Sequence, residues 1–198
     1  MRTITEKNRE RIETLFTELD AIDSHEQHRF SLSDRSKFHV SIGQRVLASE
    51  LTPGGKVPVF SANVFEPFGH VDKLLIEDFS RDSILWGIDG DWMVNYYPKD
   101  QVFYPTDHCG VLRVLTDEIH PRYMARMLET EGKKLNFSRS YRASIDRIQG
   151  ISFSAPAISL QNDVAAKVID LEHQIVDAEK RLKNLNNIKA EIIASYIN

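Results

Sequence analysis

Nine consecutive residues, Asn136 to Ser144, carry side chains suited to contacting nucleic acid. The run interleaves two arginines, three serines and an amide with aromatic residues. Arginine pairs with phosphate oxygens or with guanine, and serine and amide groups donate to phosphates or base edges. The run lies within the segment from Pro121 to Arg147, which contains seven basic and three acidic residues. A solvated basic loop is the other interpretation, and composition alone leaves both open.

Catalytic chemistry has little support in this sequence. GxSxG, HExxH and Walker motifs are absent, as is the Asn/Asp-Pro-Pro-Tyr/Phe signature of adenine methyltransferases. His108 and Cys109 are adjacent, and adjacent side chains on a strand point to opposite faces, so they do not form a nucleophile–base pair. Asp89-Gly90-Asp91 lacks the further oxygen ligands of a calcium loop and is typical of a hairpin turn. We therefore expect neither an enzyme nor a metal site.

Composition narrows the class of protein further. The chain has 198 residues and a net charge of −4, which argues against a binder that holds nucleic acid over its whole surface but leaves room for a local basic face. It has no run of about 18 apolar residues, so no membrane helix is expected. A single cysteine excludes an internal disulfide framework. The expected location is cytoplasmic, without membrane association.

The sequence divides into three segments with different patterns, and together they predict an α+β fold. Residues 1–24 form an amphipathic N-terminal helix, for which Thr5 is a candidate cap. Residues 25–158 form an irregular, β-rich domain with one helix, which starts at His120-Pro121 and ends at Gly132. The strands are expected at Val57–Phe60, Ser83–Trp86, Trp92–Tyr97, Gln101–Tyr104 and Gly110–Leu115.

Residues 159–198 contain neither glycine nor proline and form one long helix. Its apolar residues follow alternating spacings of three and four, which is a coiled-coil seam that needs a partner helix. The partner is the N-terminal helix or another chain; the sequence leaves this open. The seam consists of Val168, Leu171, Ile175, Ala178, Leu182, Leu185, Ile192 and Tyr196.

The order of these parts resembles the specificity (S) subunit of type I restriction–modification systems. In that family a recognition domain is followed by an apolar run, a proline, a glutamine and a long spacer helix. Here these are Ile151–Phe153, Pro156, Gln161 and the helical zone. KVPVFSANVFEPFGHVDK looks like the start of a recognition domain, SILWGIDGDWMVN like its central hairpin, and RSYRASIDRIQGI like the segment before the spacer helix.

The resemblance implies a non-catalytic subunit that reads double-stranded DNA. Methyltransferase (M) and restriction (R) subunits would be its partners and would carry S-adenosylmethionine, ATP and Mg, so no cofactor is expected on this chain. A complete subunit has two recognition domains, whereas this chain has one. It is expected to be a half-subunit that forms a homodimer through its helices, or the C-terminal half of a longer subunit. Paired helices would separate two recognition domains and give a split DNA target.

Candidate contacts follow from the same resemblance. Asn63 would suit adenine and Arg139 or Arg142 would suit guanine. Lysines at the end of the internal helix would anchor phosphates. The DNA-binding set is Ser61, Asn63, Lys133, Lys134, Arg139, Ser140, Tyr141 and Arg142.

Two alternatives remain open. The first is a coiled-coil interaction protein with a β-rich domain and no role on DNA, which predicts no salt-dependent DNA binding. The second is the recognition domain of a single-chain restriction–methylation enzyme, which predicts a catalytic domain upstream. The four aromatic residues Trp86, Trp92, Tyr96 and Tyr97 are expected to pack in the hairpin rather than to stack on bases.

Overall fold

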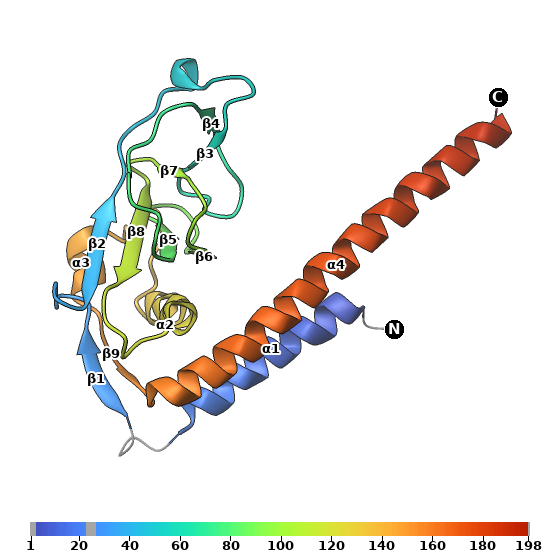
Figure 1. Ribbon diagram of the computed structural model, residues 1–198. Helices are drawn as coiled ribbons and strands as arrows, with labels where there is room; N and C mark the ends of the chain where they lie inside the picture. Colours follow the sequence, from blue (N-terminus) through green and yellow to red (C-terminus); the bar gives the residue numbers. More distant parts are fainter. Residues whose placement is uncertain (1–2, 23–26, 198) are drawn as a thin grey trace. The chain divides into compact units, whose positions relative to one another are not determined.

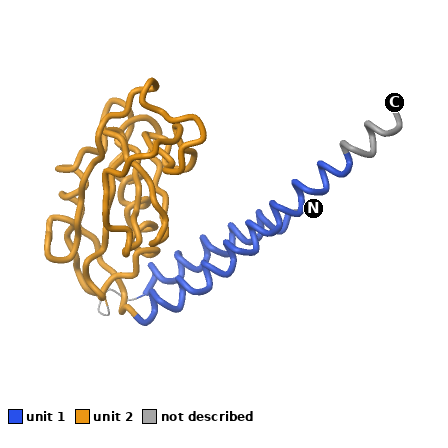
Figure 2. The backbone as a smooth tube through the Cα atoms, turned by 45° about the horizontal axis from the view of Figure 1, so that its top comes forward, with its two compact units in different colours: residues 1–23, 159–198 blue, residues 24–158 orange. Residues whose placement is uncertain are grey.

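The computed structural model describes residues 3–22 and 27–197, with side chains described to residue 189. The chain forms two compact units (Figure 2). Residues 24–158 make the β-rich unit, and residues 1–23 with 159–198 make the helical unit. The predicted α+β class is confirmed: a β-rich region is accompanied by a short N-terminal helix and a long C-terminal helix.

The helical unit consists of α1 (Ile4–Asp20) and α4 (Ile158–Ile197). The two helices lie side by side and run antiparallel (Figure 1), with Leu15 near Leu171 and Ile4 near Leu182. The predicted cap of α1 is wrong by two residues. Thr3 is the N-cap: its hydroxyl accepts from the Glu6 N–H, and the Glu6 carboxylate accepts from the Thr3 N–H. This capping box starts the helix at Ile4.

The main sheet of the β-rich unit has four antiparallel strands in the order β2-β8-β5-β6. Its central pair aligns Ile84 with Leu112 and Leu85 with Val111. Every residue of β5 is buried, because both faces of this strand are covered. The strands are β2 (Phe38–Ile42), β5 (Ser83–Gly87), β6 (Val94–Tyr97) and β8 (Cys109–Val114).

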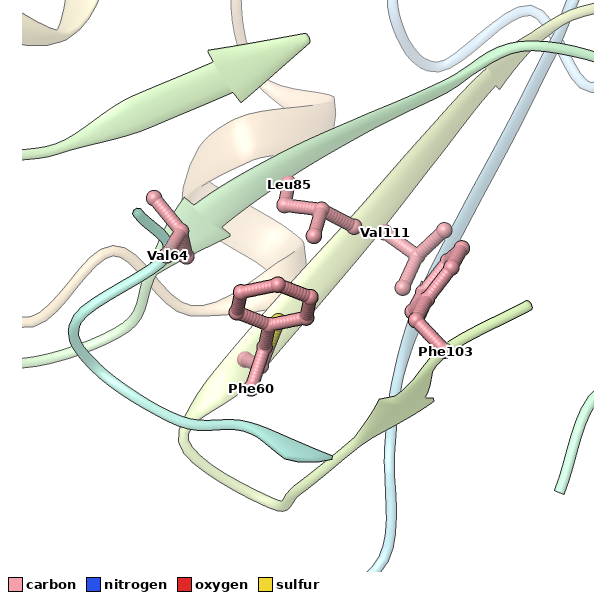
Figure 3. Packing of buried hydrophobic residues seen from close by; sticks show 6 residues of the cluster. Phe60, Val64, Leu85, Phe103 and Val111 are labelled. Carbon is pink, nitrogen blue, oxygen red and sulfur yellow. The ribbon is translucent and has the colours of Figure 1, made fainter. Parts of the chain in front are cut away.

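The two faces of this sheet are covered differently. Helix α2 (Pro121–Lys134) packs against β5, β6 and β8. A cluster of buried side chains lies in front of the sheet in Figure 3, with the helix behind it. The members of the cluster are Phe60, Val64, Leu85, Phe103, Cys109 and Val111. Burying apolar surface on both faces is the main source of stability for such a strand.

The β-rich unit also contains a three-stranded sheet in the order β4-β3-β7. Strand β3 (Val57–Phe60) pairs antiparallel with β4 (Gly69–Val71) and parallel with β7 (Tyr104–Pro105). The 3-10 turn Ala48–Glu50 precedes β3. The strand expected at 101–104 is therefore mostly wrong, since extended pairing is confined to its last residue and the proline after it.

Strands β1 (His28–Ser31) and β9 (Ser152–Ala155) pair antiparallel, with His28 opposite Ala155. Helix α3 (Ile145–Gln149) precedes β9. The rings of Phe30 and Phe153 stack with 5.7 Å between their centroids. The chain therefore enters and leaves the β-rich unit through two neighbouring strands.

Two glycines of this unit have distinct roles. Gly90 has φ +88° in the turn between β5 and β6, which confirms the predicted hairpin. Gly132 does not end its helix, because α2 continues to Lys134. A Cβ at position 132 would lie 2.2 Å from the Trp92 ring, so this glycine permits close packing of the indole on the helix.

Candidate nucleic-acid interface

The loop 136–144, which we call the recognition loop, is anchored at its start by aromatic packing. Phe137 is buried, and its ring centroid lies 5.1 Å from that of Trp92. Trp92 in turn donates from Nε1 to the Glu129 carbonyl at 3.0 Å. The loop thus leaves α2 in a fixed direction, and the two tryptophans pack within the fold as the sequence predicted.

The end of the recognition loop is fixed by two hydrogen bonds to strand β5 and its hairpin. The Ala143 N–H donates to the Ile88 carbonyl at 2.8 Å, and Trp86 Nε1 donates to the Ala143 carbonyl at 2.9 Å. Trp86 and Ala143 are both essentially inaccessible to solvent. Because buried polar groups are costly to leave unpaired, this anchor holds the loop closely.

Between these anchors the chain makes a tight turn that exposes its tip. The Ser138 and Tyr141 backbones bond to each other in both directions, at 3.0 and 3.2 Å. Arg139 and Ser140 occupy the tip and are exposed. Among the described residues no hydrogen bond or ion pair is found for the Arg139 guanidinium, whereas Ser140 Oγ lies 3.2 Å from Ser138 Oγ. An unpaired guanidinium on a fixed turn is well placed to bind an acceptor.

Tyr141 lies between two side chains of the same unit. Its ring stacks on Phe137 at 5.7 Å between centroids, and Arg147 lies over the ring with its Cζ 3.9 Å from the centroid. Arg147 also donates to the Arg142 carbonyl at 2.6 Å. Tyr141 remains 41% exposed.

A chain of polar contacts joins the recognition loop to Ser61. The Thr106 hydroxyl donates to Ser61 Oγ at 3.1 Å and accepts from the His108 N–H at 3.2 Å. His108 Nδ1 lies 3.0 Å from Asp89 Oδ1, and Arg142 donates to Asp89 Oδ2 at 3.4 Å. Two regions of the sequence-predicted set, Ser61 and the recognition loop, are therefore brought together.

Asn63 has a structural task that sequence reasoning did not predict. Its Oδ1 accepts from the backbone N–H groups of Phe65 and Glu66, at 2.9 and 3.1 Å. Reading adenine with both amide atoms would use this oxygen as well. With the turn intact, the side-chain nitrogen is the group of Asn63 that is left for a further partner.

The two lysines expected to anchor phosphates are paired with glutamates on their own helix. Lys133 bonds to Glu129, and Lys134 bonds to Glu131 at 2.7 Å. Both ammonium groups are well exposed, and exposed pairs contribute little energy, so the lysines can exchange partners. Among the described residues, no side-chain hydrogen bond or ion pair connects either lysine with the contacts that run from Ser61 to Arg142.

The predicted lack of a cysteine nucleophile agrees with the surroundings of Cys109. Its side chain is inaccessible, and burial raises the pKa of the thiol to about 12. A thiol of that pKa is protonated at neutral pH and is a poor nucleophile. Within residues 3–22 and 27–189, whose side chains are described, no group of three or more His, Cys, Asp and Glu side chains is arranged to hold a metal ion.

The seam of α4 divides into a covered and an uncovered part. Val168, Leu171 and Ile175 are buried in the stretch beside α1, and Ala178 is partly buried. The Asn8 amide donates to Gln174 Oε1 at 3.2 Å across the two helices. Further along, Leu182 and Leu185 are 58% and 63% exposed. Ile192 and Tyr196 lie outside the residues whose side chains are described.

Pairing of the helices within the chain thus accounts for half of the seam. Beyond it Ile188 is also exposed, at 51%. Exposed apolar side chains in a row along one helix are typical of an interaction surface. In the described part of the chain, no helix is both long and apolar enough to cross a membrane.

Two residues of the site were not predicted from the sequence. The sequence pattern places Asp89 in a hairpin turn and indicates no role for Arg147 beyond its positive charge. Asp89 bonds to Arg142, 53 residues away, and no local pattern signals such a contact. The sequence shows an aspartate in a hairpin turn and a basic loop as separate features. Only the fold brings Asp89 and Arg142 into contact.

Comparison with curated proteins gives two partial matches, both from Mycoplasma pneumoniae. The first, a putative type I specificity subunit N-terminus, is 28% identical over 80 residues, or 40% of this chain and 42% of that protein. The second, another putative type I specificity subunit, is 26% identical over 90 residues, or 44% of this chain and 27% of that protein. No protein-family model matches the chain.

Solved structures match over nearly the whole chain. The S subunit of a type I restriction–modification system from M. genitalium aligns with a TM-score of 0.69 and 18% identity, covering 95% of this chain and 53% of that one. The HsdS subunit from Thermoanaerobacter tengcongensis gives a TM-score of 0.59 and 13% identity, covering 89% and 46%.

A third match comes from a study of complex assembly and conformational transition in the type I system. It has a TM-score of 0.58 and 15% identity, and it covers 96% of this chain and 51% of the other. The resemblance seen in the sequence is confirmed by both kinds of comparison. The chain has the fold of about half of a type I specificity subunit, and it spans less than half of each curated relative in sequence.

Proposed function

We propose that this chain is the DNA-reading part of a type I restriction–modification specificity subunit and performs no chemistry itself. The observation that carries the proposal is the recognition loop, a basic turn pinned at both ends with the Arg139 guanidinium unpaired at its tip. A reading element must hold its donors in place, because base pairs differ in the positions of their donors and acceptors. The similarity to specificity subunits supports the same function.

In this proposal the loop enters the major groove of double-stranded DNA. Arg139 and Arg142 contact base edges or phosphates, with Ser140 and Tyr141 beside them. Lys133 and Lys134 leave their glutamates and bind phosphates, which sets the register. The net charge of −4 limits the affinity of one chain alone, so partner subunits supply part of the grip.

The uncovered seam of α4 supplies the assembly surface. Its exposed leucines bind a helix from a second copy of this chain or from another half-subunit, which brings two recognition domains together. Methyltransferase subunits with S-adenosylmethionine, and restriction subunits with ATP and Mg, then act where the domains bind. These cofactors belong to the partners in this proposal, and the assembly works in the cytoplasm, where the DNA is.

The proposal is tested by selection from a random pool of duplex DNA. The purified chain at low ionic strength, alone and with a type I methyltransferase subunit, is expected to enrich a defined sequence. Binding is expected to weaken steeply as salt rises, because phosphate contacts release counterions. A pool that remains random in both settings, with no salt-dependent binding, contradicts the proposal and favours the interaction protein without a DNA role.

A further inference from the structure

Beside the recognition loop lies an open hollow, which we call the Ser61 hollow. Its volume is about 380 Å³, and Ser61, Phe68, the segment 45–48 and the turn 106–108 line it. All of these residues belong to the β-rich unit. The polar contact chain described above runs along one wall, from Ser61 through Thr106 to His108.

The hydrogen bonds inside the wall determine which groups face the hollow. Ser61 Oγ accepts the Thr106 proton, so the hydroxyl proton of Ser61 is free to be donated elsewhere. Thr106 is 3% exposed and has both its donor and its acceptor occupied within the wall. Ser61 is therefore a directed donor, and Thr106 positions it.

His108 is oriented in the same way by Asp89. His108 Nδ1 lies 3.0 Å from Asp89 Oδ1, and this contact fixes the orientation of the ring. The Asp107 carboxylate is 40% exposed, and its Oδ2 lies 3.9 Å from Nε2. Asp107 thus places acceptor oxygens at the hollow, opposite in character to the Ser61 hydroxyl and the exposed Arg45 guanidinium.

This mixture of groups indicates whether the hollow would bind a phosphate or the edge of a base. A phosphate site gathers donors and positive charge, and a carboxylate such as Asp107 opposes it. A base edge in the major groove presents donors, acceptors and, on thymine, a methyl group. The hollow offers donors, acceptors and the apolar side chains of Leu47 and Phe68, which are about half exposed.

We propose that the Ser61 hollow reads the edge of a base pair, as a second reading element beside the recognition loop. Asp107 accepts from an exocyclic amine of cytosine or adenine, and Arg45 and Ser61 donate to the acceptors of the same or the adjacent pair. Asp89 holds both His108 and Arg142, so it sets the spacing between the two elements. This inference rests on the proposed function and assigns new residues to it.

The test uses the full chain and the duplex that the wild type enriches from the random pool, together with duplexes that differ from it by one base pair. Asp107→Asn is expected to lower discrimination at one base pair about 10-fold, as the loss of a single base contact does. Affinity for unrelated DNA is expected to stay the same or to rise, because a negative charge is removed. Arg45→Gln is expected to relax the same or the neighbouring base pair.

Asp117→Asn is the matched control, because Asp117 is an exposed aspartate of the same unit that does not line the hollow. It is expected to leave every preference unchanged. If Asp107→Asn and Arg45→Gln alter target and unrelated duplexes equally, with midpoints of thermal unfolding as in the wild type, the hollow reads no base and the inference is overturned. Selection by the wild type is then intact, and the proposed function still stands. A wild type that selects no sequence overturns both.

Discussion

The guanidinium carbon of Arg147 lies 3.9 Å from the centroid of the Tyr141 ring, while one of its nitrogens donates to the carbonyl of Arg142. One side chain therefore holds two successive residues of the recognition loop. Arg147 makes these contacts from α3, outside the loop itself. Its position makes it a support for the loop, and it requires no contact with DNA of its own.

We expect Arg147→Ala to loosen the recognition loop without unfolding the unit. A cation–π contact and a hydrogen bond together contribute about 2 kcal/mol. The Tyr141 amide, which donates to the Ser138 carbonyl, should exchange its hydrogen faster, and target discrimination should fall about 10-fold. Arg147→Lys keeps the charge over the ring and should recover part of both effects. Unchanged amide exchange in Arg147→Ala would show that the loop is held by its other anchors.

Arg139→Ala tests the tip of the loop. If the guanidinium pairs with a guanine, discrimination at one position should fall about 10-fold or more; if it binds a phosphate, affinity should fall for all duplexes and the salt dependence should become shallower. Arg35→Ala is the control, since Arg35 is another exposed arginine of the β-rich unit. Equal affinity and preference in Arg139→Ala and the wild type would remove Arg139 from the interface.

Asn63 allows its structural role and its role on DNA to be separated. Asn63→Asp retains the oxygen that accepts from Phe65 and Glu66 but loses the amide donor, whereas Asn63→Ala loses both. Asn63→Ala should destabilise the turn by about 1 kcal/mol, measured by urea unfolding, and Asn63→Asp should not. If the side-chain nitrogen contacts a base, both variants should lose discrimination at the same position. Wild-type binding by Asn63→Asp would confine Asn63 to its turn.

Stability should fall in mild acid because of His120. Its Nδ1 accepts from the Arg122 N–H as the N-cap of α2, and a protonated ring cannot accept this bond. Burial lowers the pKa of His120 below its usual 6.5, so its stabilising effect is complete above pH 6.5 and is lost as the pH falls towards the folded-state pKa. The loss of this cap should cost about 1 kcal/mol.

The measurement for His120 is urea unfolding between pH 7.5 and pH 5. His120→Asn supplies a capping oxygen that does not titrate, and it should flatten the change in stability relative to the wild type. The same pH dependence in both proteins would assign the effect to other groups.

The uncovered seam of α4 predicts a change of mass in solution. Leu182→Glu with Leu185→Glu places two charges on the exposed stripe and should convert a dimer of the chain to a monomer. Val176→Glu is the control, because Val176 is exposed at 46% but lies outside the seam. Light scattering gives the mass of each protein. A wild type that is strictly monomeric, alone and with the methyltransferase subunit, would contradict assembly through this stripe.

Local patterns predicted the three longest helices and the strands β3, β5, β6 and β8. The alternating run Val57–Phe60 became β3, and the glycine-free heptads became α4. Strands β2 and β4 were not predicted. Strands β1 and β9 were also missed, because His28–Ser31 contains one strongly apolar residue and its partner lies more than a hundred residues away. Their pairing depends on the folded unit between them, and short-range patterns do not report it.

The candidate site, like the fold, was predictable from the sequence only in part. The basic character of residues 139–142 was evident from the sequence, and the structure places these residues on a single anchored loop. What the sequence could not supply was the position of Asp89 between His108 and Arg142, which joins three separate segments. Asn63 was selected for its amide, yet the direction of its oxygen depends on a local turn that its residue type alone does not specify.

The pairing of β1 with β9 has a consequence for how such a protein can change over time. The chain enters and leaves the β-rich unit through adjacent strands, His28–Ser31 and Ser152–Ala155. The segment between them therefore begins and ends at one place in the fold, and we call it a cassette. Recombination at those two strands could exchange the whole cassette for another while the helices on either side keep their sequence. Under the proposed function, a new DNA preference would then arise in one genetic step, without requiring any partner subunit to adapt.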